Sequence, residues 1–269
     1  MKLAHEMASL VLSLAACSAF QAADSGTSGA APSDDAGSNS TDAGDAATAP
    51  AADARPPAPA EGLIGYWKFD EGSGAIAQDS SGHQNDALIT NGVWAPGKYG
   101  TAMKSTGPDR VRVAALDGAH FPQTGTLAFW LNAASFEGLW VFDVYDNKSL
   151  VYVTVNPKDE NGPARIEVLM TKREPLKSGP TTEFVSSLPI AVNEWHHVAV
   201  VWDTAAHHGY AYFDAKLTLD KPLPTDWAPS DETFQFFAPG CCDDALRGLV
   251  DDVRLYDRAL SATEIPSLP

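Results

Sequence analysis

Residues 63–69 read Leu-Ile-Gly-Tyr-Trp-Lys-Phe, an apolar and aromatic run that ends at a turn-forming Asp-Glu-Gly-Ser-Gly segment. β-Branched and aromatic residues in runs of this length are typical of β-strands. Similar runs separated by Gly, Pro, Asn and Asp follow at residues 126–131, 139–142, 150–155, 165–169 and 195–202. The one helix signal is the capping pattern Ser261-x-x-Glu264, which predicts a single short turn. We therefore expect an all-β sandwich or jelly roll.

Composition divides the chain near residue 61. Residues 21–60 contain no Trp, Tyr, Leu, Ile, Val or Phe and consist almost wholly of Ala, Asp, Ser, Gly, Thr and Pro. Such a segment buries too little apolar surface to offset the entropy of ordering, so residues 17–61 are predicted to be a disordered tether. All the tryptophans follow it, and residues 62–269 have a length that suits one sandwich domain.

The N-terminus has the features of an export signal. Residues 8–16 carry no charge and directly precede Cys17. The run is too short to cross about 30 Å of hydrocarbon as a helix, but it fits a secretory apolar region. Residues 14–17, Leu-Ala-Ala-Cys, resemble the bacterial lipobox, which implies a signal peptide over residues 1–16 and a lipid anchor on Cys17. The expected location is the bacterial outer membrane or cell surface; a plain signal peptide or a buried apolar helix is the alternative.

The charge is strongly acidic, with 18 Lys and Arg against 35 Asp and Glu and a net charge of -17. This balance argues against nucleic acid as a partner, because phosphate binding needs a basic face. It suits hard cations such as calcium.

Motifs along the whole domain resemble the bacterial laminin G-like domains of the concanavalin A-like lectin/glucanase superfamily. The motifs are at residues 62–74, 79–82 (Asp-Ser-Ser-Gly), 97–100 (Gly-Lys-Tyr-Gly), 194–200 (Glu-Trp-His-His-Val-Ala-Val) and 248–261. The resemblance implies a concanavalin A-like jelly roll of two antiparallel sheets in which the first and last strands are neighbours. It does not name a ligand, because this fold hosts lectins, protein-binding modules and hydrolases.

Calcium is the cofactor that the resemblance implies, beside the paired terminal strands. The matching positions are Asp70, Asp79 and Asp251. Three carboxylates would need carbonyl or water oxygens to complete the shell of 6 to 8 that calcium takes. Asp251 and Asp252 are adjacent, so alternation predicts that only one faces inward, and we expect it to be Asp251. The alternative is that Asp79 forms an Asx-type turn and Asp251 is a buried acceptor.

Catalytic machinery is not evident. The glucanase branch uses acidic residues two apart on one strand face, and the nearest approach here is Asp143 and Asp146, three apart and so on opposite faces. Gly-x-Ser-x-Gly, Walker and His-Glu-x-x-His motifs are also missing. We therefore expect a protein that is not an enzyme.

Two further pairs need interpretation. Cys241 and Cys242 are adjacent, and export favours oxidation, so a vicinal disulfide is predicted, with two thiols or an intermolecular bridge as alternatives. Neighbouring strand residues face opposite sides, so His196 and His197 are expected to be structural rather than metal ligands.

Ligand contact is expected from aromatic residues outside the core pattern, namely Trp140, Tyr145 and Trp227. The remaining strand tryptophans, Trp67, Trp130, Trp195 and Trp202, are expected to pack in the core. The leading hypothesis is a non-catalytic surface module that binds extracellular or cell-wall polysaccharide. A protein–protein adhesion module is the second hypothesis, and a glycan hydrolase or lyase is the third.

Overall fold

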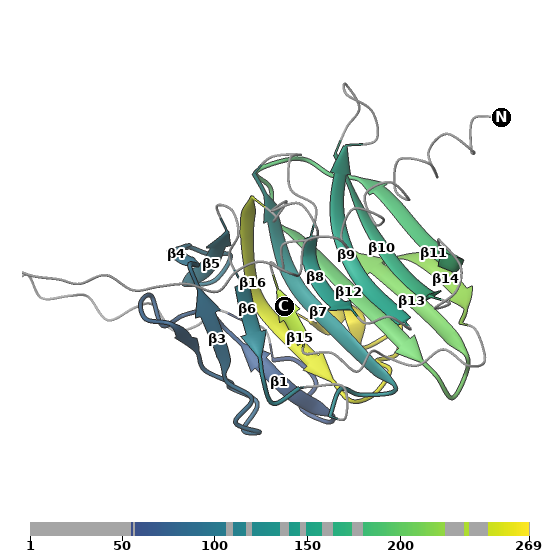
Figure 1. Cartoon of the computed structure of the whole chain (residues 1–269), viewed down its shortest axis with the longest axis horizontal. Coiled ribbons are helices and arrows are strands. Elements are labelled where there is room, and N and C mark those ends of the chain that lie inside the picture. The colour runs from purple at the N-terminus through teal and green to yellow at the C-terminus, as the bar shows by residue number, and fades with distance from the viewer. Residues whose placement is uncertain are drawn as a thin grey trace, which may run out of the picture.

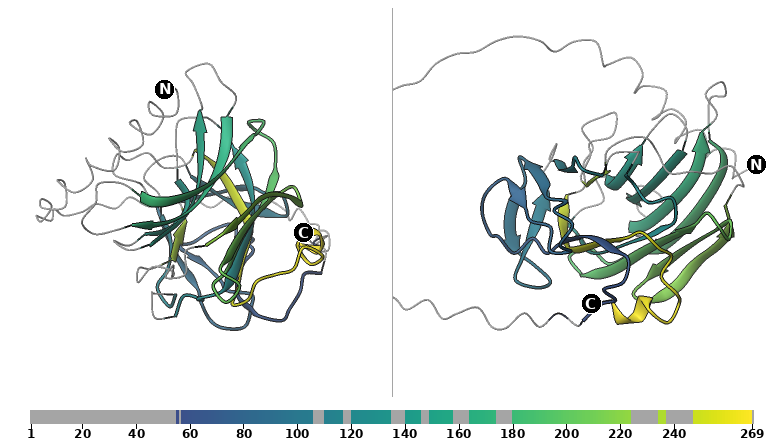
Figure 2. Two further views of the ribbon diagram at one scale, coloured as in Figure 1. Left: turned by 90° about the vertical axis from the view of Figure 1, so that its right-hand side faces the viewer. Right: turned by 90° about the horizontal axis from the view of Figure 1, so that it is seen from below.

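A computed structural model describes Arg55 and residues 57–105, 110–116, 120–134, 140–145, 149–157, 164–173, 180–223, 234–236 and 247–268. These residues form two antiparallel sheets of eight strands each, and the helical content among them is one 3-10 turn, η2 (Ile265–Ser267). The two sheets lie face to face as layers (Figures 1 and 2). The all-β sandwich predicted from the sequence is confirmed.

The first sheet has its strands in the order β14 (Lys216–Pro222), β13 (His208–Phe213), β12 (His196–Asp203), β7 (Gly125–Ala133), β16 (Gly248–Tyr256), β5 (Thr101–Ser105), β4 (Val93–Pro96), with β1 (Leu63–Trp67) also paired to β16. The second sheet has the order β11 (Pro180–Pro189), β10 (Ala164–Arg173), β9 (Ser149–Pro157), β8 (Trp140–Tyr145), β15 (Phe234–Phe236), β6 (Arg110–Val113), β3 (Ala87–Thr90), β2 (Ile76–Ala77).

Aromatic rings join the two sheets. Trp67 of β1 stacks on Phe234 of β15 at 5.6 Å between ring centroids, and Phe121 stacks on Phe234 and on Trp202 at 5.8 and 5.5 Å. Trp67 and Trp202 are fully buried, as their strand positions predicted. Trp130 differs, because it follows the buried Phe129 in the alternation of β7 and is therefore on the outer face of the first sheet, half-buried.

The terminal strands are neighbours. β1 pairs antiparallel with β16, with Tyr66 opposite Arg254 and Trp67 opposite Val253. β16 therefore carries β5 along its first residues and β1 along its last residues. This pairing confirms the adjacency that the family resemblance implied, and it brings together motifs from the two ends of the domain (Figure 1).

The outer face of the first sheet is covered by the C-terminal segment. Leu260, Ile265 and Leu268 pack in a second apolar cluster with Tyr256, and Ala58 from before β1 packs against the same cluster. Ser261 donates from its backbone N–H and its hydroxyl to Glu264 Oε2 at 2.9 and 2.8 Å, so the predicted capping turn is present. Among the residues that the structure describes, no helix has the length and apolarity needed to cross a bilayer.

Candidate functional site

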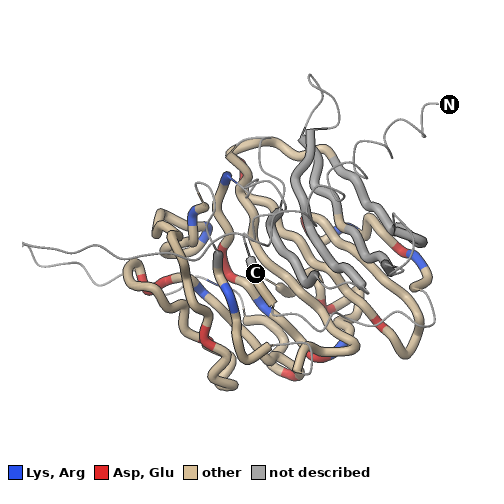
Figure 3. Tube along the Cα trace, viewed as in Figure 1, with Lys and Arg blue, Asp and Glu red and all other residues tan. Residues whose placement is uncertain are grey.

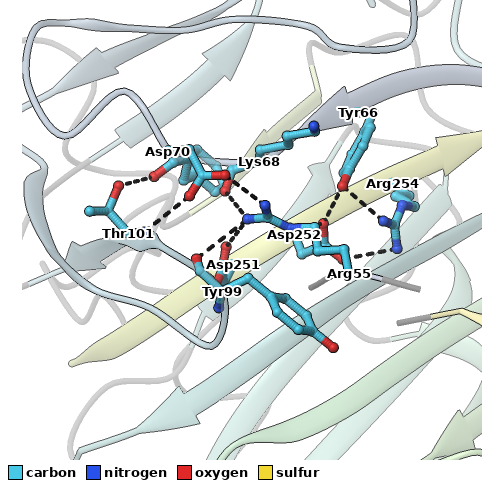
Figure 4. A network of polar contacts seen from close by, with 10 residues as sticks. Arg55, Tyr66, Lys68, Asp70, Tyr99, Thr101, Asp251, Asp252 and Arg254 are labelled. Atoms are coloured by element: carbon cyan, nitrogen blue, oxygen red, sulfur yellow. Dashed lines mark hydrogen bonds and ion pairs between the residues drawn. The ribbon is translucent and has the colours of Figure 1, made fainter. Parts of the chain in front are cut away.

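Oxygen atoms from several segments converge on the guanidinium of Arg55 (Figure 4). Its Nη1 donates to Asp70 Oδ2 at 2.7 Å, and its Nη2 donates to the backbone carbonyls of Lys68 and Tyr99, each at 3.4 Å. Only 5% of the Arg55 side chain is exposed. We call this group the Arg55 cluster, and its members are Arg55, Asp70, Asp251, Asp252 and the carbonyls of Lys68 and Tyr99.

β16 contributes two consecutive carboxylates to the cluster. Asp251 Oδ1 is 3.9 Å from Arg55 Nη2, and Asp252 Oδ1 is 3.1 Å from Arg55 Nε. The prediction that only Asp251 faces the site is therefore wrong. The reason is a bulge: the register of β16 shifts between Asp251 and Arg254, and Asp252 has a φ of 53°. An extra residue in the strand places two neighbours on one side and interrupts the period of two.

The loop that contains the Gly-Lys-Tyr-Gly motif contacts the carboxylates of Asp70 and Asp251. Tyr99 donates its backbone N–H to Asp251 Oδ2 at 2.9 Å, and Thr101 donates its backbone N–H to Asp70 Oδ1 at 3.1 Å. A Cβ on Gly97 would lie 2.6 Å from Asp251 Oδ2, and a Cβ on Gly100 would collide with Asp70 Oδ1. The glycines of the motif therefore make room for the carboxylates.

Asp251 is held in an unusual electrostatic state. Its side chain is fully buried, and this burial raises the pKa of its carboxyl to about 7, although the Tyr99 N–H and Arg55 act in the opposite direction. Its Oδ1 has no hydrogen-bond partner, because Arg55 Nη2 is too far away for one. A buried carboxylate oxygen without a partner has lost its hydration without replacement, which favours the approach of a cation.

Asp252 is fixed by a second set of contacts that ties β1 to β16. The hydroxyl of Tyr66 donates to Asp252 Oδ1 at 2.7 Å and accepts from Arg254 Nη2 at 2.9 Å. Arg254 Nη1 also lies 2.9 Å from Asp252 Oδ2, and its guanidinium is 4.3 Å from the centre of the Tyr66 ring. Burial and the charge of Asp252 raise the pKa of Tyr66, so its hydroxyl keeps its proton. Figure 3 shows acidic and basic positions of β16 side by side near the middle of the molecule.

Asp79 is not part of the Arg55 cluster. Its Oδ1 accepts the backbone N–H groups of Tyr66 and Ser81 at 2.9 and 2.8 Å, and its Oδ2 accepts from the Ser81 hydroxyl and the Asn85 N–H at 2.7 and 3.0 Å. This is the Asx-type turn that the sequence left open as the alternative. The predicted trio Asp70, Asp79 and Asp251 therefore does not converge, because the oxygens of Asp79 are already used by backbone donors.

The remaining oxygen atoms of the Arg55 cluster are of the kinds that could hold a calcium ion. Carboxylate and carbonyl oxygens are the ligands that Ca²⁺ takes, and Asp70, Asp251 and the carbonyls of Lys68 and Tyr99 supply both kinds. Arg55 is placed where these oxygens converge. Within the described ranges, no group of three or more His, Cys, Asp and Glu residues is arranged to hold a metal ion. The oxygen donors fit a cation, and in this structure that cation is a guanidinium.

Sequence reasoning missed Arg55. The tether composition assigned it to a disordered segment, yet its side chain is almost fully buried against the domain. One signal was available: Arg55 is the one basic residue between residues 21 and 60, in a segment rich in Asp.

The predicted ligand-contacting residues are placed only in part. Trp140 and Tyr145 are the first and last residues of β8 in the second sheet, where they pair with Thr154 and Leu150. Trp227, Cys17, Cys241 and Cys242 lie outside the described residues. His196 and His197 face opposite sides, with His196 bonded to Asp214 and His197 buried.

A row of paired residues crosses the second sheet next to β8, and three of its four members are exposed. Ile76 pairs with Leu88, Leu88 pairs with Arg112, and Arg112 pairs with Gln235. Ile76 and Leu88 are 44% and 52% exposed, Arg112 is exposed and Gln235 is half-buried. Gln235 in turn pairs with Asp143 of β8. We call Ile76, Leu88, Arg112 and Gln235 the outer row.

The outer row was also missed from sequence. Its signal is the alternation of β3, where the buried Ala87 and Ile89 flank the exposed Leu88, and of β6, where Val111 and Val113 flank Arg112.

The sequence model of the concanavalin A-like lectin/glucanases superfamily matches residues 106–266, more than half of the chain. The chain belongs to this superfamily. A comparison with curated proteins found no match.

Solved structures share the fold at low sequence identity. Domain 4 of AbnA, an extracellular GH43 arabinanase from Geobacillus stearothermophilus in complex with arabinotriose, is similar with a TM-score of 0.57 and 17% identity, over 76% of this chain and 96% of that one. The binding domain of Paraclostridial Mosquitocidal Protein 1 has a TM-score of 0.59 and 14% identity, over 76% and 51%. The binding domain of botulinum neurotoxin DC in complex with SialylT has a TM-score of 0.55 and 14% identity, over 76% and 50%. This chain spans about half the length of the two toxin chains.

Proposed function

We propose that this chain is a non-catalytic module that binds polysaccharide through the outer row and the adjoining strand β8. The observation that carries the proposal is the fold shared with the arabinanase domain solved with arabinotriose, which the match covers over 96% of its length. Membership of a superfamily of lectins and glucanases supports the same class of ligand.

The chemistry of the outer row suits a sugar chain. Ile76 and Leu88 form an exposed apolar pair across β2 and β3, which matches the C–H faces of a pyranose or furanose ring. Arg112 and Gln235 continue the row and offer donors and an acceptor for hydroxyl groups. An apolar surface with a few polar groups that fix orientation is the usual composition of a small-ligand site.

Strand β8 lies next to the outer row. Asp143 pairs with Gln235, and Trp140 and Tyr145 are at the two ends of the strand. Stacking of sugar rings on Trp140 and Tyr145 stays part of the proposal, and these two aromatic residues would let several sugar units of one polysaccharide be contacted at once. Hydrolysis would need two carboxylates that flank the scissile bond, and the sequence has no pair of acidic residues two apart of the kind the glucanase branch uses. Recognition without catalysis is therefore the function we assign.

The N-terminal lipobox resemblance completes the proposal. A lipid on Cys17 would hold the chain at the outer membrane or cell surface, and residues 18–54 would place the sandwich at a distance from the lipid headgroups. Stable anchoring takes two acyl chains or more, which a diacylated cysteine provides.

Binding is tested on an array of plant, bacterial and animal glycans, followed by calorimetry with the strongest ligand. We expect saturable binding that falls about tenfold or more when Leu88 and Arg112 are both replaced by Ala, a loss of about 1.4 kcal/mol. The matched control is Leu217→Ala on β14 of the first sheet, since Leu217 is 51% exposed and as apolar as Leu88. The control should bind like the wild type.

Two results would contradict the proposal. Retention of protein partners with no sugar bound would favour the adhesion function. Release of reducing ends from a bound polysaccharide, lost on Asp143→Asn, would make the chain an enzyme.

A further inference from the structure

The side chain of Arg55 is seated in the manner of a bound ion. Arg55 precedes β1, and the next described residue, Pro57, is exposed. The Arg55 side chain is nevertheless buried, with only 5% of it exposed. Its partners come from the end of β1, the loop before β5 and the bulge of β16. Figure 4 shows these groups pointing at one guanidinium from different sides.

The carboxylates of the Arg55 cluster are held in place by groups other than Arg55. Asp70 is bonded to the Thr101 N–H, Asp251 to the Tyr99 N–H, and Asp252 to the Tyr66 hydroxyl. A pocket whose ligands are fixed by the surrounding backbone keeps its geometry when the cation changes.

Arg55 does not form a hydrogen bond with every oxygen atom of the cluster. The buried Oδ1 of Asp251 is directed toward the guanidinium but makes no hydrogen bond, and 3.9 Å separates it from Nη2. A spherical cation coordinates carboxylates at about 2.3 to 2.6 Å and is not limited to the planar directions of a guanidinium. Such an ion would reach Asp251 and Asp70 together.

We propose that the Arg55 cluster is a divalent-cation site that the chain fills with its own arginine, so that Ca²⁺ binds only by displacing Arg55. The two occupants are mutually exclusive, because both need Asp70 Oδ2, Asp251 Oδ1 and the carbonyls of Lys68 and Tyr99. Asp252 keeps its partners Tyr66 and Arg254 in either state.

Displacement has a mechanical consequence. Arg55 and Ala58 hold the end of the tether on the outer face of the first sheet. Release of residues 55–60 would add roughly 20 Å of extended chain between the membrane anchor and the domain. The cation would thereby set the reach of the module, independently of which ligand the second sheet binds.

The test is a calcium titration of the wild type and of Arg55→Gln, by calorimetry and by thermal melting in the presence of Ca²⁺ or a chelator. We expect Arg55→Gln to bind Ca²⁺ at least tenfold more tightly than the wild type and to show the larger calcium-dependent rise in Tm. Adding Asp251→Asn to Arg55→Gln should abolish both effects. Arg258→Gln is the matched control. Arg258 forms an ion pair with Glu264, with 2.6 Å between Nη2 and Oε1, and it is not a member of the Arg55 cluster. Its loss should leave the calcium affinity unchanged.

A second readout keeps the proposal falsifiable if Arg55→Gln does not fold. In the wild type, backbone amide relaxation of Ala58 and Ala60 should show increased mobility as Ca²⁺ is raised into the millimolar range, while Leu63 in β1 stays rigid. Equal calcium affinity in the wild type and Arg55→Gln, or calcium binding with no change in the mobility of Ala58 and Ala60, would overturn the proposal.

Discussion

Gly100 illustrates how the absence of one side chain positions a carboxylate. Its φ is 55°, and a Cβ at this position would collide with Asp70 Oδ1. Gly82 also has a positive φ, of 92°, but nothing lies within 4 Å of the place a Cβ would occupy. A side chain at Gly82 would meet only the cost of a left-handed backbone, whereas a side chain at Gly100 would also be crowded by Asp70.

We expect Gly100→Ala to lower the free energy of unfolding by more than Gly82→Ala. Gly82→Ala should cost about 1 kcal/mol, because alanine is strained at positive φ. Gly100→Ala should cost a further 1 to 3 kcal/mol, roughly the cost of overpacking. Urea denaturation of both variants measures the difference, and equal losses would show that Asp70 is not held against this loop.

His197 makes stability depend on pH. Its ring is buried beside Trp130, and burial, together with the charge of Arg254, lowers its pKa to about 4. The unfolded chain has a histidine pKa near 6.5. Below that pH the histidine is therefore protonated in the unfolded state while the buried ring of the folded state is still neutral. The stability associated with the neutral ring is complete above pH 6.5 and is lost as the pH falls toward 4.

We expect the wild type to lose about 3 kcal/mol relative to His197→Gln between pH 6.5 and pH 4, and no more below that range. Chemical denaturation at a series of pH values measures this difference. A wild-type curve parallel to that of the variant through this window would mean that the buried ring titrates normally.

At the residue scale, the sequence singled out Asp70 and Asp251, which the structure brings together around Arg55, but it did not predict their neighbours Arg55 and Asp252. Strict alternation along β16 would exclude Asp252 from the Arg55 cluster. A bulge places it there, with a positive φ at Asp252 that Asp tolerates better than most residues. Bulges depend on the register of neighbouring strands, which composition and spacing do not contain. Asp79 has a structural role in the family motif, because its two oxygen atoms accept four hydrogen bonds from Tyr66, Ser81 and Asn85.

At the scale of single elements, β1 and β16 are the pair on which the site depends. The Tyr66 hydroxyl connects them through Asp252 and Arg254, in addition to the backbone ladder. Strand-length apolar runs predicted β1, β7, β8, β9, β10 and β12, but not the short strands β2 to β6 or the strands β11, β13, β14 and β15. The pairing of the first with the last came from the family motifs, because the two segments are separated by almost the whole domain.

Tyr66→Phe should lower the free energy of unfolding by about 1.5 to 3 kcal/mol, because it removes hydrogen bonds to two charged groups that are both buried. Guanidinium denaturation provides the measurement. Tyr210→Phe is the control, since Tyr210 lies on β13 and stacks on His208, away from the terminal strands. Comparable losses in the two variants would contradict a special role for the Tyr66 hydroxyl.

At the scale of the whole molecule, the Arg55 cluster and the outer row lie on different sheets. The first sheet carries the Arg55 cluster and the end of the tether on its outer face, and the second carries the outer row. The family motifs predicted the sandwich because they mark turns and the terminal strands. They did not predict the outer row, because the identity of an exposed residue is not fixed by packing in the core.

The proposed membrane anchor also concerns the whole molecule. We expect Cys17→Ser to abolish incorporation of a labelled fatty acid in a bacterial host and to move the chain from the membrane fraction to the soluble exported fraction, because the proposed acyl chains are attached to this thiol. Cys241→Ser and Cys242→Ser are the controls and should remain acylated. Fatty-acid labelling that persists in Cys17→Ser would contradict the anchor.

The most direct measurement is hydrogen–deuterium exchange of the full chain with and without the saccharide that binds most strongly on the array. The amides of β3, β6, β15 and β8 should be protected by the saccharide, while those of β12, β13 and β14 exchange at unchanged rates. Protection confined to the first sheet, or no protection at saturating saccharide, would contradict recognition of polysaccharide by the outer row.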